Sequence, residues 1–106
     1  MNIVHVKPNG QELESWVALI DNEVVGHIFM KLESTDKLKF MDAWVHDDHR
    51  RKGIYRKLWD TRWEYVQNNY KGYKIYAWCK NESLPLLVEK GFSTGEICTY
   101  VEITII

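Results

Sequence analysis

The feature that most constrains the fold is a change of hydrophobic period within residues 45–55. Before it, short apolar runs are separated by turn residues, which is the pattern of β-strands. After it, apolar residues recur at three- and four-residue spacing, which is the pattern of an amphipathic helix. The residues that set this second period are Tyr55, Leu58, Trp59, Trp63 and Val66. The segment Val45–Tyr55 therefore ends a strand, turns through charged residues and opens a helix.

The same patterns along the chain predict a mixed sheet with two main helices. Strands are expected at residues 3–7, 15–20, 24–32, 38–45, 73–79 and 96–105, and helices at 54–68 and 82–90. Asp21-Asn22 marks a tight turn between two strands, and Gly26 marks a bulge or a close backbone approach. A strand, a helix and a strand in succession favour a right-handed parallel crossover. The predicted fold class is α+β, with one central parallel pair in a mostly antiparallel sheet.

Length and composition indicate one globular domain, residues 1–106. A chain of 106 residues has no room for a second domain, and 45% hydrophobic residues are enough for a core. The formal net charge of −1 argues against a nucleic-acid or membrane partner. Cys79 and Cys98 form neither a zinc pattern nor a disulfide framework, so no metal is expected. We expect no signal peptide and no membrane span, and hence a cytoplasmic protein.

The turn before the first helix carries three consecutive cations, Arg50, Arg51 and Lys52, followed by Gly53. A helix start presents unpaired backbone N–H groups and a partial positive charge. Together with the cations, these groups make a cradle for a phosphorylated ligand. Gly53 lets such a ligand approach the backbone, because no Cβ stands in the way.

Two blocks of the sequence resemble the GNAT N-acetyltransferase superfamily. The stretch Arg50-Arg51-Lys52-Gly53-Ile54-Tyr55 resembles the acyl-coenzyme-A-binding motif of that family, Arg/Gln-x-x-Gly-x-Gly/Ala. The block from Asn81 to Phe92 resembles a second motif, an Asn and a helix that ends in Glu-Lys-(x)-Gly-Phe. With the matching order of strands and helices, the resemblance spans about residues 15–100.

The resemblance implies acetyl-CoA as the cosubstrate and a set of residues that bind it. These residues are Trp44, Val45, Arg50, Arg51, Lys52, Gly53, Ile54, Tyr55 and Asn81. The first two would offer backbone groups to the pantetheine arm, in a slot where the two parallel strands splay apart. Residues 50–55 would hold the pyrophosphate, Asn81 would contact the coenzyme, and the thioester would lie near Trp44.

The sequence departs from the family pattern at two positions. Tyr55 replaces the last Gly or Ala of the first motif, although it also fits the apolar face of the helix. Many members carry a Tyr in the second helix that protonates the departing thiolate, and this chain has Val88 or Leu87 there, depending on the direction of counting. Neither side chain can give a proton, so water or another group must do so.

The sequence does not single out one residue as the general base. An amine acceptor is protonated at neutral pH, so an acidic group or ordered water must remove a proton. Asp42 is the best candidate, because two-residue steps along a strand put it on one face with Trp44 and His46. A strand Asp that faces solvent or pairs with a nearby Lys is an equal alternative. Further candidates are His46, His49, Tyr100 and Glu102.

Two elements of the family are reduced in this sequence. Members usually have two helices between the first and second strands, but only residues 8–14 separate these strands here. Residues 93–106 are enough for one long strand or two very short ones. The acceptor groove should therefore be open, and an exposed sheet edge should carry Val101, Ile103 and Ile105. Because such edges are usually paired, we expect a homodimer through the C-terminal strand.

Three functions fit these features. The preferred one is transfer of an acetyl group from acetyl-CoA to an amine, such as a protein lysine, a protein N-terminus or a polyamine. The second is a module that binds acyl-CoA or a protein without turnover, which the missing Tyr favours. The third is a small nucleic-acid-binding domain that uses His49–Lys52, which Asp47, Asp48 and the net charge disfavour.

Overall fold

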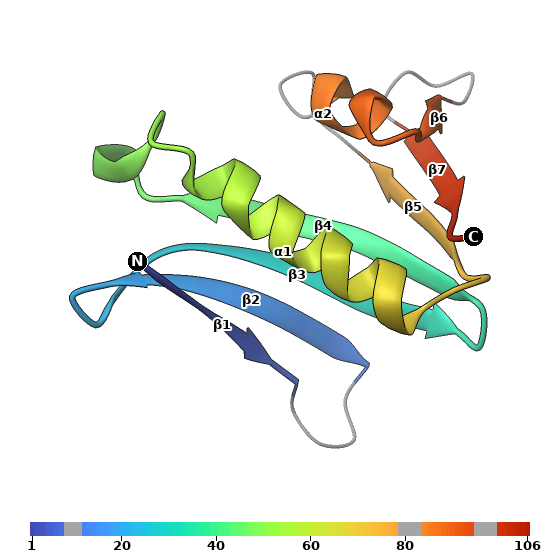
Figure 1. Cartoon of the computed structure of the whole chain (residues 1–106), viewed down its shortest axis with the longest axis horizontal. Helices are drawn as coiled ribbons and strands as arrows, with labels where there is room; N and C mark the ends of the chain where they lie inside the picture. Colours follow the sequence, from blue (N-terminus) through green and yellow to red (C-terminus); the bar gives the residue numbers. More distant parts are fainter. Residues whose placement is uncertain (8–11, 79–83, 95–99) are drawn as a thin grey trace.

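The structure is a computed structural model that describes residues 1–7, 12–78, 84–94 and 100–106 (Figure 1). Its strands are β1 (Asn2–Val6), β2 (Leu13–Ile20), β3 (Glu23–Ser34), β4 (Lys37–Val45), β5 (Lys74–Trp78), β6 (Ser93–Thr94) and β7 (Tyr100–Thr104). Its helices are the short 3-10 helix η1 (Asp47–His49), α1 (Ile54–Asn69) and α2 (Leu84–Glu89). None of the described helices has the length and apolarity needed to cross a membrane.

The strands form one sheet in the order β1-β2-β3-β4-β5-β7-β6. Neighbouring strands are antiparallel except β4 and β5, which run parallel and are connected through α1. The predicted α+β fold with a central parallel pair and two main helices is therefore confirmed. β2 and β3 extend beyond their predicted ends because strand pairing continues there, with Leu13 opposite Lys31 and Ser34 opposite Lys37.

The predicted tight turn between β2 and β3 is confirmed. Asp21 and Asn22 both adopt positive φ, at 51° and 67°. Two successive positive φ angles characterise the type I′ turn, whose twist matches that of the two strands it joins. Asp and Asn tolerate this conformation better than other non-glycine residues, so the local sequence alone specifies the hairpin.

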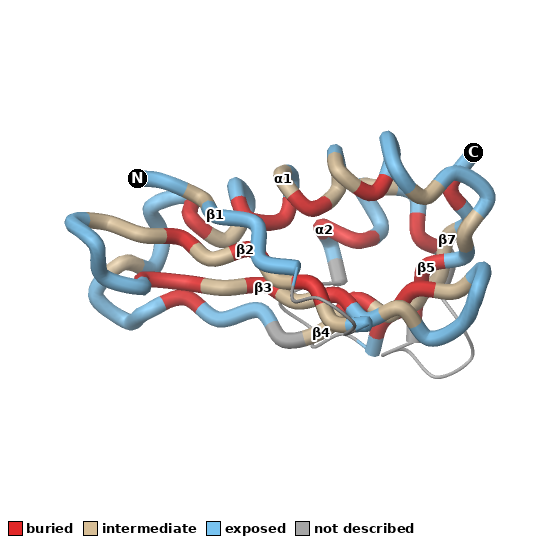
Figure 2. The backbone as a smooth tube through the Cα atoms, turned by 90° about the horizontal axis from the view of Figure 1, so that it is seen from below, coloured by how far each residue is buried: buried red, intermediate tan, exposed pale blue. Residues whose placement is uncertain are grey.

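Both described main helices lie on the same face of the sheet (Figure 2). α1 directs Ile54, Leu58, Trp59 and Val66 into the core, where they are buried with the inward-facing residues of the strands. Two ion pairs join α1 to the C-terminal end of α2 and the residue after it: Arg56–Glu89 at 3.1 Å and Asp60–Lys90 at 3.0 Å. No helix among the described residues covers the opposite face of the sheet. We call this opposite side the open face.

Gly26 on β3 allows α1 to pack closely against the strands, as its position in the sequence predicted. A Cβ added at Gly26 would lie 3.0 Å from the Trp44 carbonyl oxygen and 3.2 Å from Leu58 Cδ1. An irregular register between Ala18 and Leu19 of β2 also falls beside it. The first turns of α1 are therefore held directly over β3 and the end of β4.

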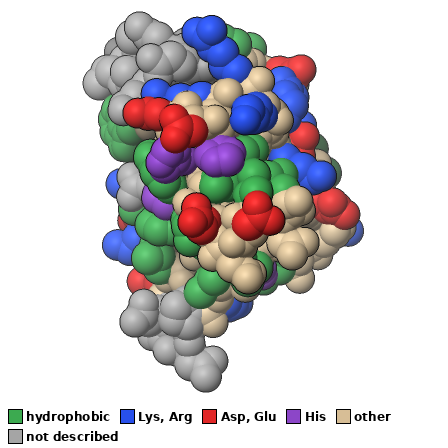
Figure 3. All heavy atoms as spheres, turned by 90° about the vertical axis from the view of Figure 1, so that its left-hand side faces the viewer, with side chains coloured by type: hydrophobic (Ala, Val, Ile, Leu, Met, Phe, Trp, Pro, Cys, Tyr) green, Lys and Arg blue, Asp and Glu red, His purple; other side chains and the backbone are tan. Residues whose placement is uncertain are grey.

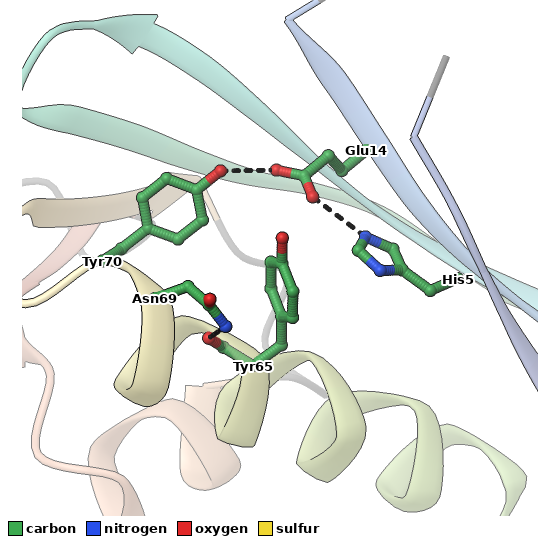
Figure 4. A network of polar contacts seen from close by, with 5 residues as sticks. All are labelled: His5, Glu14, Tyr65, Asn69 and Tyr70. Carbon is green, nitrogen blue, oxygen red and sulfur yellow. Dashed lines mark hydrogen bonds and ion pairs between the residues drawn. The ribbon is translucent and has the colours of Figure 1, made fainter. Parts of the chain in front are cut away.

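A buried polar network lies at the C-terminal end of α1 (Figure 4). Glu14, which is 3% exposed, accepts the Tyr70 hydroxyl at 2.7 Å and lies 2.9 Å from His5 Nε2. Tyr65 directs its hydroxyl toward the same carboxylate. Burial first, and the Glu14 carboxylate second, raise the pKa of both Tyr65 and Tyr70. The network fastens β1 and β2 to the far end of α1, away from residues 45–55.

The C-terminal part of the sheet differs from the prediction. β7 is not the edge strand, because it lies between β5 and the two-residue β6. Val101 and Ile105 are buried, and Ile103 packs against the core, so these side chains do not form an exposed edge. Their alternation reflects a strand with one buried face, and alternation alone does not reveal which neighbours a strand has. The homodimer itself stays a prediction.

Candidate functional site

The turn after β4 is held by hydrogen bonds of His46. The backbone N–H of His46 donates to the Val25 carbonyl at 2.8 Å, and its carbonyl accepts the His49 N–H at 2.8 Å. Its Nδ1 accepts the backbone N–H of Asp48 at 3.1 Å, so the imidazole caps η1. Asp47 and Asp48 occupy the first turn of η1, where acidic side chains favour the positive end of the helix.

Arg50 stabilises the same turn. Its Nε donates to the Val45 carbonyl at 3.2 Å, and its guanidinium lies 3.0 Å from Asp47 Oδ1. The side chain therefore ties the end of β4 to η1. Arg51 follows with a φ of 64°, a conformation that costs a non-glycine residue energy. Arg51 and Lys52 are both exposed, which leaves their charges available to a ligand.

α1 begins at an open N-terminus. Gly53 is its N-cap residue, with a φ of 80° and no capping side chain. The first helix-type bond runs from the Lys57 N–H to the Gly53 carbonyl at 3.0 Å, so the N–H groups of residues 54–56 are the unpaired donors of a helix start. A Cβ at Gly53 would meet nothing within 4 Å. The side-chain position of Gly53 is therefore open space, and the unpaired N–H groups beside it are the kind of donors that bind anions.

A shallow, open hollow continues from this helix start along α1. Its lining residues are Gly53, Arg56, Lys57, Asp60, Thr61 and Glu64. A ligand whose phosphate lies at the start of α1 could extend over this surface.

β4 and β5 part beneath the middle of α1, and β4 alone continues toward the helix start. Their parallel pairing ends at Phe40 opposite Ala77, whereas β4 runs on to Val45 with only β3 beside it (Figure 1). Within the described residues, the β5-facing side of β4 is therefore unpaired beyond Phe40. Unpaired strand groups can bond an extended ligand in the way an added strand does. The described residues are consistent with strands that part here, and the slot itself stays a prediction.

The unpaired end of β4 contains a bulge. Met41 lies opposite Phe29, and Trp44 lies opposite His27, so two residues of β4 face the single residue between those positions on β3. Met41 and Trp44 consequently share one face although three positions separate them. A bulge redirects side chains at the place where the strands part.

Aromatic rings line the open face from the bulge to the turn. The ring centroids of His27 and Phe29 are 4.8 Å apart, those of His27 and Trp44 are 5.3 Å apart, and His46 and His49 continue the series. Trp44 is 38% exposed. In Figure 3, which faces the end of the molecule with η1 and the start of α1, histidine side chains lie together with acidic groups on both sides. An acceptor entering from the open face would meet this aromatic surface.

A buried guanidinium lies on the other face of the same strands. Arg62 of α1 donates to the Phe29 carbonyl at 2.8 Å, and its Cζ lies 3.6 Å from the centroid of the Phe40 ring. Burial lowers the pKa of Arg62 to about 9. The residue braces α1 against the last paired rung of β4 and β5.

The predicted coenzyme residues fall into three groups. Trp44, Val45 and residues 50–55 converge on the helix start and the unpaired end of β4. Tyr55 is partly buried against the core, so its side chain joins the apolar face of α1. Asn81 lies outside the described residues, and its role stays a prediction.

The predicted catalytic residues are tested less directly. Asp42 lies on β4 at the bulge, and its side chain is outside what the structure describes, so its role as base stays a prediction. Because β4 bulges between Met41 and Trp44, two-residue spacing alone does not establish that Asp42 and Trp44 share a face. Leu87 is buried and Val88 is exposed, and neither can donate a proton.

His27 is a site residue that sequence reasoning missed. It lies opposite Trp44 on the open face, and its Nδ1 is buried without a hydrogen-bond partner among the described residues. The cross-strand register brings it to the site, and no motif of the sequence contains it. In the sequence, the two-residue spacing of His27 and Phe29 indicates that they share a face of the strand. That spacing does not reveal that Trp44 lies opposite His27.

The chain belongs to the GNAT acetyltransferase family. The family model described as "Acetyltransferase (GNAT) family" matches residues 5–92, which includes the turn at 45–55 and the strands on both sides of it. No curated protein sequence matches the chain.

Solved structures support the same fold. The chain is similar to Tetrahymena GCN5, with 16% identity and a TM-score of 0.69 over 90% of this chain and 69% of that one. It is similar to a GNAT acetyltransferase from Elizabethkingia anophelis with acetyl-CoA bound, with 17% identity and a TM-score of 0.69 over 86% and 74%. It is also similar to the N-acetyltransferase YhbS from Escherichia coli in complex with CoA, with 15% identity and a TM-score of 0.70 over 88% and 59%.

Proposed function

We propose that this protein is an acetyl-CoA-dependent N-acetyltransferase with an amine acceptor. One observation carries the proposal: the open N-terminus of α1 at Gly53 lies beside the unpaired end of β4. The first feature suits the coenzyme pyrophosphate, and the second suits the pantetheine arm. The coenzyme-bound relatives from Elizabethkingia anophelis and Escherichia coli share this fold and support the assignment.

The proposed binding mode gives each part of the site a task. The N–H groups at the start of α1, with Arg51 and Lys52, hold the pyrophosphate, while Arg50 keeps the turn in shape. The backbone of Trp44 and Val45 aligns the pantetheine arm along β4. The thioester then lies near Trp44, on the route from the coenzyme slot to the open face.

The proposed reaction is direct transfer. The neutral acceptor amine attacks the thioester carbonyl, and a backbone N–H of the unpaired β4 segment stabilises the developing oxyanion. The carbon–sulfur bond then breaks, and the amine proton passes to a base, for which Asp42 and His27 are the candidates. Coenzyme A leaves as a thiolate that water protonates, since Leu87 and Val88 cannot do so.

A binding module without turnover is the second candidate, and the same Leu87 and Val88 favour it. Calorimetry with acetyl-CoA, followed by thiol release with a panel of amines, separates the two. Binding with turnover supports the enzyme, and binding without turnover for any amine supports the module. No binding at millimolar acetyl-CoA would exclude both.

Two parts of the proposal concern the setting of the protein. We expect a cytoplasmic location, and sedimentation at micromolar concentration tests the homodimer. A monomer under those conditions would refute the dimer, whose original argument from an exposed C-terminal edge no longer applies.

A further inference from the structure

Four lysines lie together on the open face of the sheet. Lys31 of β3, Lys37 and Lys39 of β4 and Lys74 of β5 alternate with buried residues that face α1. The lysines therefore point away from α1, on the side that no described helix covers. We call this group the lysine band.

Strand pairing places like charges opposite one another in this band. Lys31 is directly opposite Lys39 across the antiparallel pair, and Lys37 is level with Lys74 across the parallel pair. Like charges directly opposite each other destabilise a sheet. The electrostatic cost is partly offset at Lys37 and Lys74, which have partners within the sheet, and it remains for Lys31 and Lys39.

Three acidic residues border the band within the described part of the chain: Glu102, Asp36 and Glu33. Glu33 is exposed on β3, two residues after Lys31, and the structure records no ion pair for it with another described residue. Lys74 pairs with Glu102 of β7 at 3.2 Å, and Lys37 lies 4.7 Å from the centre of the Tyr76 ring. Asp36, in the β3–β4 turn, accepts a hydrogen bond from Ser34 at 3.0 Å. The structure records no ion pair for Lys31 or Lys39 among these residues.

Protection of a sheet edge does not explain these lysines. Lysines on edge strands prevent sheets of two molecules from joining, but β3, β4 and β5 are interior strands. Solvent-facing positions of interior strands can carry uncharged polar residues without this repulsion. A surface that concentrates one charge is better explained by an oppositely charged ligand.

The band lies on the acceptor side of the proposed active site. Successive pairs along β3 and β4 are Lys31 with Lys39, then Phe29 with Met41, then His27 with Trp44. Trp44 is five steps along β4 from Lys39, and at about 3.3 Å per step this is roughly 16 Å. An extended peptide covers that distance with about five residues.

From this geometry we infer that the acceptor is an acid-rich polypeptide segment. Its carboxylates contact Lys31 and Lys39, its apolar side chains contact Phe29 and Met41, and its acceptor amine lies near Trp44, about five residues from the acidic group. The inference rests on the proposed function for the acceptor role. It disfavours polyamines and basic tails, because their charges would oppose the band.

Fluorescence anisotropy of labelled peptides tests the docking without any turnover. Each peptide carries one acceptor lysine, with either Glu or Arg at positions four to six from it on one side or the other, so the basic peptide gains charge without gaining a second acceptor amine. Wild-type protein should bind an acidic peptide about tenfold more tightly than the basic one, and added salt should reduce the difference. Thiol-release assays with acetyl-CoA should show the same order in kcat/KM.

Charge reversal supplies the decisive comparison. The double variant K31E/K39E keeps like charges opposite each other, so its folding should resemble that of the wild type, and its preference should invert toward the basic peptide. The variant K7E/K71E has the same change in net charge away from β3, β4 and β5, and should keep the acidic preference.

Several outcomes would overturn the inference. Equal affinity for acidic and basic peptides would do so, as would an unchanged preference in K31E/K39E. Tighter binding of a single-stranded oligonucleotide of equal charge would replace the peptide with nucleic acid. Failure of acetyl-CoA binding would refute the proposed function separately, and acidic peptides that bind but never accept acetyl would overturn the acceptor role of the band.

Discussion

Two glycines with almost the same backbone conformation allow coenzyme binding to be separated from folding. Gly53 has a φ of 80° and Gly72 has a φ of 86°, and a Cβ at either would meet nothing within 4 Å. Alanine in this conformation costs about 1–2 kcal/mol, and the reduced entropy of the unfolded chain offsets about 0.4–1 kcal/mol of that. Gly53→Ala and Gly72→Ala should therefore each lower the free energy of unfolding by about 1 kcal/mol.

Their effects on the coenzyme should differ. Gly53 is the N-cap of α1 and directly precedes the donors proposed to hold the pyrophosphate, so a methyl group there would fill space that is now empty next to them. We expect Gly53→Ala to weaken acetyl-CoA binding at least about tenfold, or about 1.4 kcal/mol, and Gly72→Ala to leave it unchanged. Urea unfolding gives the stabilities and calorimetry gives the affinities. If both variants bind acetyl-CoA like the wild type, the pyrophosphate does not lie at Gly53.

Three further substitutions test the packing of the fold. Gly26→Val should destabilise the protein by about 1–3 kcal/mol in urea unfolding, because its side chain would overlap the Trp44 carbonyl and α1. Tyr70→Phe removes a hydrogen bond to a buried carboxylate and should cost about 1.5–3 kcal/mol. The pKa of Tyr70 is raised above its usual value of 10. The stability that the neutral hydroxyl contributes is therefore present below pH 10 and is lost as the pH rises further. In Tyr70→Phe, the free energy of unfolding should depend less on pH in that range. Lys39→Glu places a negative charge directly opposite Lys31 and should raise the free energy of unfolding by about 0.2–1 kcal/mol. A lower free energy of unfolding would contradict the argument that these two lysines repel each other.

Local patterns predicted most of the fold because the interactions behind them are local. The turn at Asp21-Asn22 requires residues that tolerate positive φ. The spacing of apolar residues in α1 is what any helix needs to pack one face on a core. The position of β7 was different. Its alternation is satisfied by any place in the sheet that buries one face, so its neighbours depend on long-range pairing.

The candidate site was predicted in outline for the same reason. The glycine turn between β4 and α1 is a continuous segment, and its motif identified the helix start. The bulge at Asp42 could not be foreseen, since it exists only relative to the register of β3. His27 reaches the site through that register, and the use of Arg50 as a tie between β4 and η1 depends on the path of the folded turn.

The close contact at Gly26 also limits which acyl donors the proposed site would accept by length. It holds the first turns of α1 close to the carbonyl of Trp44, so the proposed phosphate site and the proposed thioester position would lie at a set distance from each other. An acyl donor would then fit only if the distance between its phosphate and its sulfur matches the distance between those two positions. Short acyl thioesters that lack the nucleotide, such as S-acetyl-N-acetylcysteamine, would fit the slot along β4 but have no anchor to set their depth.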